Sequence, residues 1–380
     1  MAMTTETIFT NARIVMPDDV VLGTVAVRDG RIAAIDGGRS AVPAAQDIEG
    51  DCLIPGIVDV HTDHLEHHLE PRPGVKWPGL AALVSHDHQI AGSGITTVLD
   101  SLSMGFDLSS EGRKIALQLA MDTLGTAKRE GLLKADHMLH LRCEIPSPYL
   151  LEDVSRVIDH PLVRLASVMD HTPGQRQWRD LEKWRTFHSR RYAGKQLDEI
   201  LVDRQERQER YAAENRKTIV PLFRSRGLHV ASHDDTTEQH VHEAVEAGIT
   251  ISEFPTTMPA ARLAREIGLK TVMGGPNVVM GGSHSGNVAA LDLAREGLLD
   301  GLASDYVPNS LIQAAFTLHA EQGFPLHETI RWVSAGPAAM VGLDDRGRIA
   351  EGLRADLVRV KVFRETPVVR EVYLKGDRVI

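Results

Sequence analysis

The chain has 380 residues, a formal net charge of -10 and 42% hydrophobic residues, but only 4% aromatic residues. This length suits either a barrel with an appendage or two ordinary domains. The acidic balance and the few aromatic rings argue against a nucleic-acid partner, because such proteins combine a basic groove with stacking rings. No apolar run approaches a membrane span, so we expect no membrane partner.

The first thirty residues contain no uninterrupted apolar segment, so we expect no targeting helix. Cys52 and Cys143 are the only cysteines, too few for a disulfide scaffold. These features together predict a cytoplasmic protein. They leave the oligomeric state open, and a homo-oligomer is one possibility.

The two ends of the chain resemble each other in texture. Residues 7–38 alternate short β-rich runs with the turn signals PDD and DGR, and residues 344–380 repeat the pattern. Such alternation is typical of antiparallel strands joined by short turns. We therefore predict one small β-sandwich-like domain built from residues 1–52 and 345–380.

The middle of the chain alternates strand-like runs with helical stretches, which favours parallel βα units. Eight such runs begin at residues 53, 95, 137, 163, 228, 249, 270 and 301. Eight parallel strands close a barrel. The fold class predicted for residues 53–344 is therefore α/β, a (β/α)8 TIM-like barrel.

Polar residues cluster where these runs end. In a barrel, the carboxyl ends of the strands converge on one mouth, where active sites are found. Imidazoles and carboxylates meeting there suit Zn²⁺ or a similar divalent ion. A lone histidine is more often structural, and a lone acid often caps a helix, so the joint pattern carries the argument. The residues concerned are His61, Asp63, Glu144, Asp170, His171, His233, Asp234, Asp235 and Asp305.

Several phrases resemble a known family. PGIVDVHTD and GRIAEGLRADLV look like the amidohydrolase superfamily of metal-dependent hydrolases. Within it, HTDHLEHHLEPRPGVKW, MDHTPGQRQW and VMGGPNVVMGGSHSGN resemble the PhnM family of phosphonate metabolism. The resemblance implies a barrel hydrolase with one or two divalent metal ions.

The family resemblance also implies roles for individual residues, at the positions that match the family's motifs. His61 and Asp63 match a first-strand metal-binding pair, although the superfamily usually has histidine at the second position. Glu144 matches a bridging carboxylate, and His171 and His233 match the two later ligands. Asp305 matches an acid that binds metal and acts as the general base. The remaining histidines of DVHTDHLEHHLE have no matching ligand positions, and His64 and His67 are expected nearest the substrate.

The implied reaction is hydrolysis of α-D-ribose 1-methylphosphonate 5-triphosphate to the 5-phosphate and pyrophosphate. This small phosphorylated substrate needs cationic partners. Residues 176–195 hold seven Lys or Arg against two acids. Arg176 is the first candidate for phosphate, because its guanidinium can bind two oxygens at once. Arg72 and Lys76 follow.

Residues 274–287 read as a Gly-rich loop whose backbone N–H groups could bind phosphate. Asn277 and His284 are its candidate substrate contacts; as the alternative, they only hold the loop in place. Glu253, at the end of the sixth run, is expected either to orient a ligand or to contact the ribose.

Two other functions stay open. A hydrolase or deaminase acting on C–N bonds of a cyclic substrate would keep the metal site, but the basic segment argues against it, since neutral heterocycles need few cations. A non-catalytic binding protein would have lost His171, His233 or Asp305, and all three are present.

Overall fold

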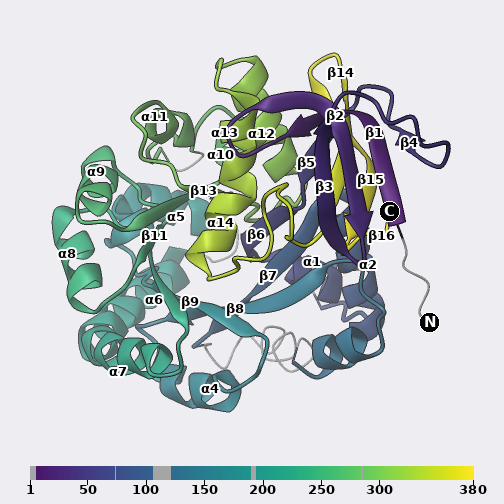
Figure 1. Ribbon diagram of the computed structural model, residues 1–380. Helices are drawn as coiled ribbons and strands as arrows, with labels where there is room; N and C mark the ends of the chain where they lie inside the picture. Colours follow the sequence, from purple (N-terminus) through teal and green to yellow (C-terminus); the bar gives the residue numbers. More distant parts are fainter. Residues whose placement is uncertain (1–5, 73, 106–120, 190–193, 284–285) are drawn as a thin grey trace.

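The computed structural model describes residues 6–72, 74–105, 121–189, 194–283 and 286–380. At its centre, eight parallel strands pair in sequence order to form the barrel, and the helices surround it (Figure 1). The predicted fold is confirmed, and each predicted run contains or overlaps one barrel strand. These strands are β6 (Ile57–Thr62), β7 (Ile95–Met104), β8 (Asp136–Glu144), β9 (Val163–Met169), β10 (His229–His233), β11 (Ile251–Glu253), β12 (Lys270–Gly274) and β13 (Gly301–Ala303).

The barrel closes between its first and last strands at the mouth. Thr62 and Asp305 form a parallel bridge. The Asp305 N–H donates to the His61 carbonyl at 2.9 Å, and the Asp63 N–H donates to the Asp305 carbonyl at 3.0 Å. The closure therefore places His61, Asp63 and Asp305 side by side, as the strand-end argument predicts.

Apolar side chains fill the barrel interior. One buried residue comes from each barrel strand, and Met340 and Val341 pack against the same layer. The eight are Val60, Leu99, Met138, Leu165, Ala231, Ile251, Val272 and Ala303. The barrel is thus a packed core and not a pore.

A second sheet contains strands from both ends of the chain, seen as the purple and yellow strands of Figure 1. Its order is β16-β15-β14-β5-β1-β2-β3, with β4 beside β1. The strands are β1 (Glu6–Val15), β2 (Val20–Arg28), β3 (Arg31–Gly37), β4 (Gln46–Asp47), β5 (Cys52–Pro55), β14 (Leu357–Phe363), β15 (Thr366–Leu374) and β16 (Asp377–Arg378).

The first predicted run, residues 53–60, is two strands and not one. Its first part is β5, which pairs with β1 and β14, and its second part is β6 of the barrel. Gly56 joins them, and a Cβ there would lie 2.0 Å from Thr96 Oγ1. Only glycine fits so close an approach, so the chain passes between the sheets at this residue.

Among the described residues, the labelled helices of the first half are α1 (His64–Leu69), α2 (Gly79–Gly92), α4 (Leu150–Val157), α5 (Leu181–His188), α6 (Gly194–Arg207) and α7 (Ala213–Arg224). Those of the second half are α8 (Glu238–Glu246), α9 (Met258–Glu266), α10 (Gly275–Val279), α11 (Ala290–Arg295), α12 (Ser310–Ala320), α13 (Leu326–Val333) and α14 (Ala335–Met340). None of the helices in the described part of the chain is long and apolar enough to cross a membrane.

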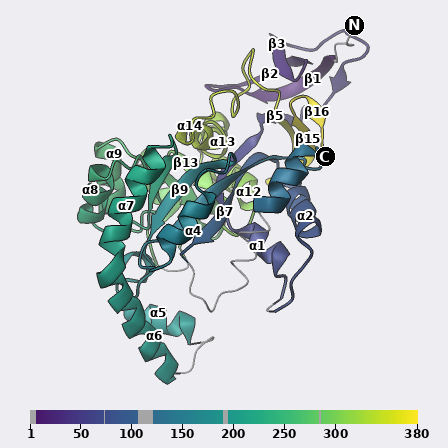
Figure 2. The ribbon, with the colours of Figure 1, turned by 90° about the horizontal axis from the view of Figure 1, so that it is seen from below.

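The segment after β9 departs from the βα rhythm. A short 3₁₀ turn, Arg176–Trp178, precedes α5, and α6 continues through a π-helical turn, Gln208–Ala212, into α7. Figure 2 shows α5 and α6 extending beyond the barrel, away from the terminal sheet.

The Gly-rich segment 274–287 is only partly a loop. Its residues Gly275–Val279 form α10, with a proline in the first turn. Proline suits this position because the first helical N–H groups have no partner within the helix. The prediction of a loop throughout was therefore wrong.

Candidate active site

Three histidines at the mouth have the same arrangement, in which Nδ1 contacts a carboxylate. His61 Nδ1 lies 2.7 Å from one oxygen of Glu253, and His233 Nδ1 lies 2.6 Å from the other. His171 Nδ1 lies 2.7 Å from Glu144. A carboxylate at Nδ1 fixes the tautomer and the ring orientation, and it leaves Nε2 as the basic nitrogen. This is the usual surrounding of a metal-binding histidine.

The open nitrogens fit a divalent cation. One ligand atom each of His171, His233 and Asp234 lies within 4.8 Å of the others. His233 Nε2 is 3.4 Å and His171 Nε2 is 3.8 Å from Asp234 Oδ2. The buried Nε2 of His61 has no hydrogen-bond partner among the described residues, and its ring stacks 5.9 Å from that of His233. Neutral imidazoles and a carboxylate are a donor set that zinc accepts.

The charges around the histidines are strongly coupled. Burial alone would raise the pKa of Glu253, but His61 and His233 outweigh it and hold that pKa well below its usual range. Burial also opposes ionisation of Glu144, yet His171 lowers its pKa to about 2. Both carboxylates are therefore ionised, and the histidines lie in a negative environment that would attract a cation.

Asp305 faces this group from the last strand. Burial raises its pKa, and nearby Asp63 adds to the rise against the opposing effect of His61. The residue has a φ of 58°, and Arg176, Asp234 and Phe254 also have positive φ. Such conformations are costly for residues other than glycine, so the surroundings must impose them here.

Asp63 and Glu144, predicted as metal ligands, have protein partners in the structure. Arg142 Nη1 donates to Asp63 Oδ2 at 3.4 Å. Glu144 accepts from both the backbone N–H and Nδ1 of His171, at 2.8 and 2.7 Å. Asp63 thus balances the charge of Arg142, and Glu144 orients the ring of His171. Direct metal coordination by these two acids stays a prediction.

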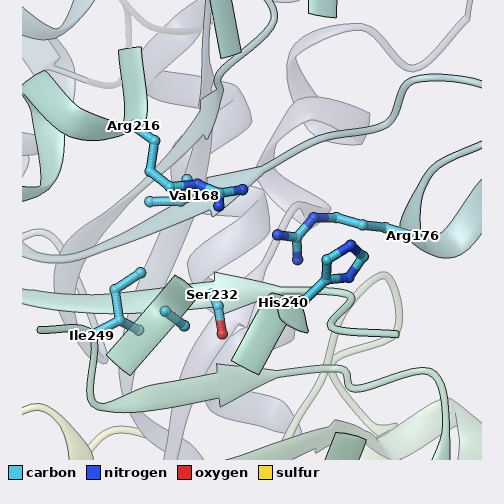
Figure 3. A pocket seen from close by; sticks show the side chains of 7 residues that line it. Val168, Arg176, Arg216, Ser232, His240 and Ile249 are labelled. Atoms are coloured by element: carbon cyan, nitrogen blue, oxygen red, sulfur yellow. The ribbon is translucent and has the colours of Figure 1, made fainter. Parts of the chain in front are cut away.

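Arg176, predicted to bind phosphate, is buried with 5% of its surface exposed. Its Nη1 donates to the His233 carbonyl and to Asp235 Oδ1, each at 2.7 Å. Figure 3 shows the guanidinium in a small pocket beside Ser232 and His240. In this position Arg176 supports the strand that carries His233, and a substrate contact by it stays a prediction.

The other predicted substrate residues lie in different settings. Arg72 and Lys76 are exposed in the turn after α1. Asn277 bonds within its own segment, accepting from Ala290 N at 2.8 Å and donating to the Val288 carbonyl at 3.3 Å. This pattern fits the alternative in which Asn277 holds the loop. His284 lies outside the described residues.

The basic segment and the Gly-rich segment lie next to each other. A Cβ built on Gly286 would lie 2.8 Å from Lys183 Nζ of α5. Arg204 of α6 is among the charges that lower the pKa of Glu144. Cations of the long segment between β9 and β10 therefore lie near the mouth, as the predicted role in phosphate binding requires.

Three site residues were not given these roles from the sequence. Glu253 was left between two roles, and it orients both His61 and His233. Asp234 was grouped with the strand-end residues but was given no role as a ligand, and Arg142 was not assigned to the site. A signal existed for Glu253, since an acid in the apolar run ITISEF needs a buried partner. Nothing in the sequence indicates that Arg142 meets Asp63 from another strand.

His140 lies in contact with His61, at 5.0 Å between ring centroids, but it is a poor ligand candidate. Its Nδ1 lies 3.1 Å from the Val60 carbonyl and its Nε2 lies 3.0 Å from Ser167 Oγ. Both ring nitrogens are thus used within the core. Burial lowers the pKa of His140 to about 3, so the ring is neutral and structural.

Known proteins are similar to this chain in sequence. Residues 203–380 match the amidohydrolase family. The alpha-D-ribose 1-methylphosphonate 5-triphosphate diphosphatase of Escherichia coli strain K12 is 40% identical, with 98% of this chain and all of the relative covered. An adenine deaminase of Desulfatibacillum aliphaticivorans is 24% identical over 97% of this chain and 57% of its own length.

Solved structures share the fold. The N-acetylglucosamine-6-phosphate deacetylase of Pasteurella multocida has a TM-score of 0.64 at 15% identity, with 98% of this chain and 99% of that chain covered. Identity this low speaks for the fold alone. The full-length likeness to the E. coli enzyme is what places this chain: it belongs to the family of alpha-D-ribose 1-methylphosphonate 5-triphosphate diphosphatases, within the amidohydrolases.

Proposed function

We propose that the protein hydrolyses α-D-ribose 1-methylphosphonate 5-triphosphate to the 5-phosphate and pyrophosphate, a step in phosphonate catabolism that precedes carbon-phosphorus bond cleavage. The family assignment supports the reaction. The observation that carries the chemistry is the set of three histidines whose Nδ1 atoms are held by Glu253 and Glu144.

The cofactor proposed is one divalent cation at the mouth, with Zn²⁺ first among the candidates. His171 and His233 would hold it through Nε2 together with Asp234, and the free Nε2 of His61 would complete the set. Histidine and carboxylate donors suit Zn²⁺. When bound, such an ion lowers the pKa of a coordinated water to about 7 and polarises phosphoryl oxygen.

Asp305 is proposed as the general base. Its raised pKa and its position beside His61 suit a carboxylate that takes a proton from the attacking water. Water oxygen then bonds to one of the two phosphorus atoms that share the anhydride oxygen, that anhydride bond breaks, and the 5-phosphate and pyrophosphate are the products. Arg142, which contacts Asp63, would keep these neighbouring carboxylates from repelling an anionic substrate.

Substrate phosphates would be bound by cations around the mouth. Arg72 and Lys76 are proposed as direct contacts because they are exposed in the turn after α1, the helix that follows the first barrel strand. Lys183 of the basic segment lies beside Gly286 of the Gly-rich segment, where the two segments predicted to bind phosphate meet. Lysine acts as a point charge for phosphate oxygens, whereas arginine can bind two of them at once.

The cellular location proposed is the cytoplasm. Cys52 and Cys143 are both buried free thiols, which is consistent with a reducing compartment.

The reaction is tested by its products. Zn²⁺-loaded protein is incubated with the ribosyl triphosphate and followed by ³¹P NMR. Pyrophosphate and the 5-phosphate should appear together in equal amounts. Release of inorganic phosphate in their place would reject the proposed bond, and turnover of dihydroorotate or adenine without triphosphate cleavage would favour the C–N hydrolase.

A further inference from the structure

A second group of histidines lies beside the mouth and takes no part in the site described above. His64 and His68 are on α1, and His86 is on α2. One ring nitrogen of each lies within 4.8 Å of the other two. The first two come from the histidine-rich stretch DVHTDHLEHHLE, whose histidines beyond His61 match no ligand position of the superfamily.

His86 is oriented as a metal ligand would be. Its Nε2 lies 2.7 Å from Asp100 Oδ1 on β7. Because an ionised carboxylate can only accept a hydrogen bond, Nε2 carries the proton. Nδ1 is therefore unprotonated, and its lone pair can bind a metal ion. This nitrogen points at His64 Nδ1, 3.5 Å away. A carboxylate behind the ring is the same arrangement found at His61, His171 and His233.

The spacing suits coordination better than a hydrogen bond. An N–H···N contact of 3.5 Å is longer than the 2.7–3.2 Å of ordinary protein hydrogen bonds. Two nitrogens on one tetrahedral zinc, each about 2.0–2.1 Å from it, lie about 3.3–3.4 Å apart. The buried Nε2 of His68 has no hydrogen-bond partner among the described residues, and binding a cation would satisfy it.

The charge behind the cluster favours a cation. Asp100 also contacts His137 Nδ1 at 2.7 Å, and Asp87 contacts His137 Nε2 at 3.1 Å. With a carboxylate at each nitrogen, His137 carries both protons and is an imidazolium. Two buried carboxylates and one imidazolium leave a net charge of about -1 directly behind His86, which a divalent cation would offset.

We propose that His64, His68 and His86 form a second divalent-metal site of the zinc class, separate from the one at the barrel mouth, with a fourth position for water or another ligand. Three imidazoles are an established zinc donor set. The site would fasten α1 to α2 and so hold the turn that carries Arg72 and Lys76. This proposal does not rest on the proposed function.

The test is metal binding by the full chain, with Co²⁺ as the probe. The His233→Ala variant removes a ligand of the mouth site, and metal-stripped protein is then titrated while the visible absorption of Co²⁺ and its bound equivalents are measured. In this background His68→Ala removes a proposed ligand. His67→Ala is the matched control, because His67 is the next residue on α1 and is exposed.

The His233→Ala protein should bind one Co²⁺ with the absorption of a tetrahedral site, and so should His233→Ala/His67→Ala. Adding His68→Ala should weaken that binding by more than about 100-fold, beyond the loss that changes around a ligand usually cause. Equal binding by the His67 and His68 variants would overturn the site. If His68→Ala does not fold, His64→Gln takes its place with the same two outcomes.

Discussion

His61 Nδ1 on the first barrel strand lies 2.7 Å from a carboxylate oxygen of Glu253 on the sixth, so one buried contact spans the mouth. The other oxygen of Glu253 contacts His233. One carboxylate thus fixes the tautomers of two proposed ligands. The proposed metal centre therefore depends more on Glu253 than on any single histidine.

Glu253→Gln should lower the affinity for Zn²⁺ about 10- to 100-fold, the usual effect of changing a group that orients ligands. An amide has one accepting oxygen, so it cannot accept from both rings. The measurement is competition for Zn²⁺ with a coloured chelator. Glu246→Gln, at an exposed position of α8, is the control and should bind like the wild type. Unchanged affinity in Glu253→Gln would contradict the role.

Asp305→Asn should lower kcat by about 10²- to 10⁴-fold, the contribution expected of a general base. Metal content should stay near normal, because His61, His171, His233 and Asp234 are untouched and still hold the ion, whereas metal binding by Asp305 itself stays a prediction. Asparagine tolerates the positive φ of 58°, so the backbone should not change.

A matched control for this change is Asp29→Asn, since Asp29 has a φ of 52° and lies in an exposed turn of the terminal sheet. Its turnover should equal that of the wild type. If Asp305→Asn keeps full activity, Asp305 is not the base.

The two arginines predicted to bind substrate should behave differently. Arg72 is exposed, so Arg72→Ala should raise KM with little change in kcat and leave stability unaffected. Arg176 pairs with Asp235 inside the core, and Arg176→Ala should lower the free energy of unfolding by about 3–5 kcal/mol.

Steady-state kinetics and thermal unfolding of both variants separate the two roles. Arg164→Ala, exposed near the opposite end of β9, removes the same charge away from the mouth and should change neither quantity. A rise in KM without destabilisation in Arg176→Ala would instead return Arg176 to the phosphate site.

Asp136 should make stability depend on acidity. Its oxygens contact Lys128 at 2.6 Å and Arg346 at 2.7 Å, joining β8 to the segment that leads to the terminal sheet. Burial opposes its charge, but these cations outweigh it and hold the pKa of Asp136 well below the usual range. Because the folded pKa is lowered, the stabilisation is full above the unfolded value of 3.8 and is lost as pH falls below it.

Asp136→Asn should therefore cost about 3 kcal/mol near neutral pH, since it removes a carboxylate partner of the buried Arg346. The difference from the wild type should stay constant between about pH 6 and about pH 4, and it should shrink as the pH falls below 3.8. Denaturant unfolding across that range measures it, with the exposed Asp344→Asn as control. A difference that does not vary with pH would show that the ion pair is not the cause.

The barrel could be predicted because each strand is a short apolar run followed by polar residues, a local pattern that survives in the sequence. The division of residues 53–60 at Gly56 could not, because it depends on the closeness of Thr96, which lies on another strand. For the same reason Arg142 was missed as the partner of Asp63. Local patterns indicate which residues reach the mouth, whereas their pairing is decided by strands distant in the sequence.

The histidine-rich stretch DVHTDHLEHHLE illustrates the same limit of prediction from sequence. It contains four histidines, but only His61 matches a known ligand position. The place of His64 and His68 became interpretable when the fold brought His86 and Asp100 beside them. Helix α2 and strand β7 supply these two residues, and no spacing within the stretch could have indicated them.

The central claim is tested most directly by the specificity of the metal-loaded protein. The measurement is kcat/KM for α-D-ribose 1-methylphosphonate 5-triphosphate beside that for dihydroorotate and for adenine, with the same preparation. The account predicts turnover of the ribosyl triphosphate that exceeds the other two by several orders of magnitude and disappears in Asp305→Asn. Efficient turnover of dihydroorotate or adenine, with the triphosphate left intact, would contradict it.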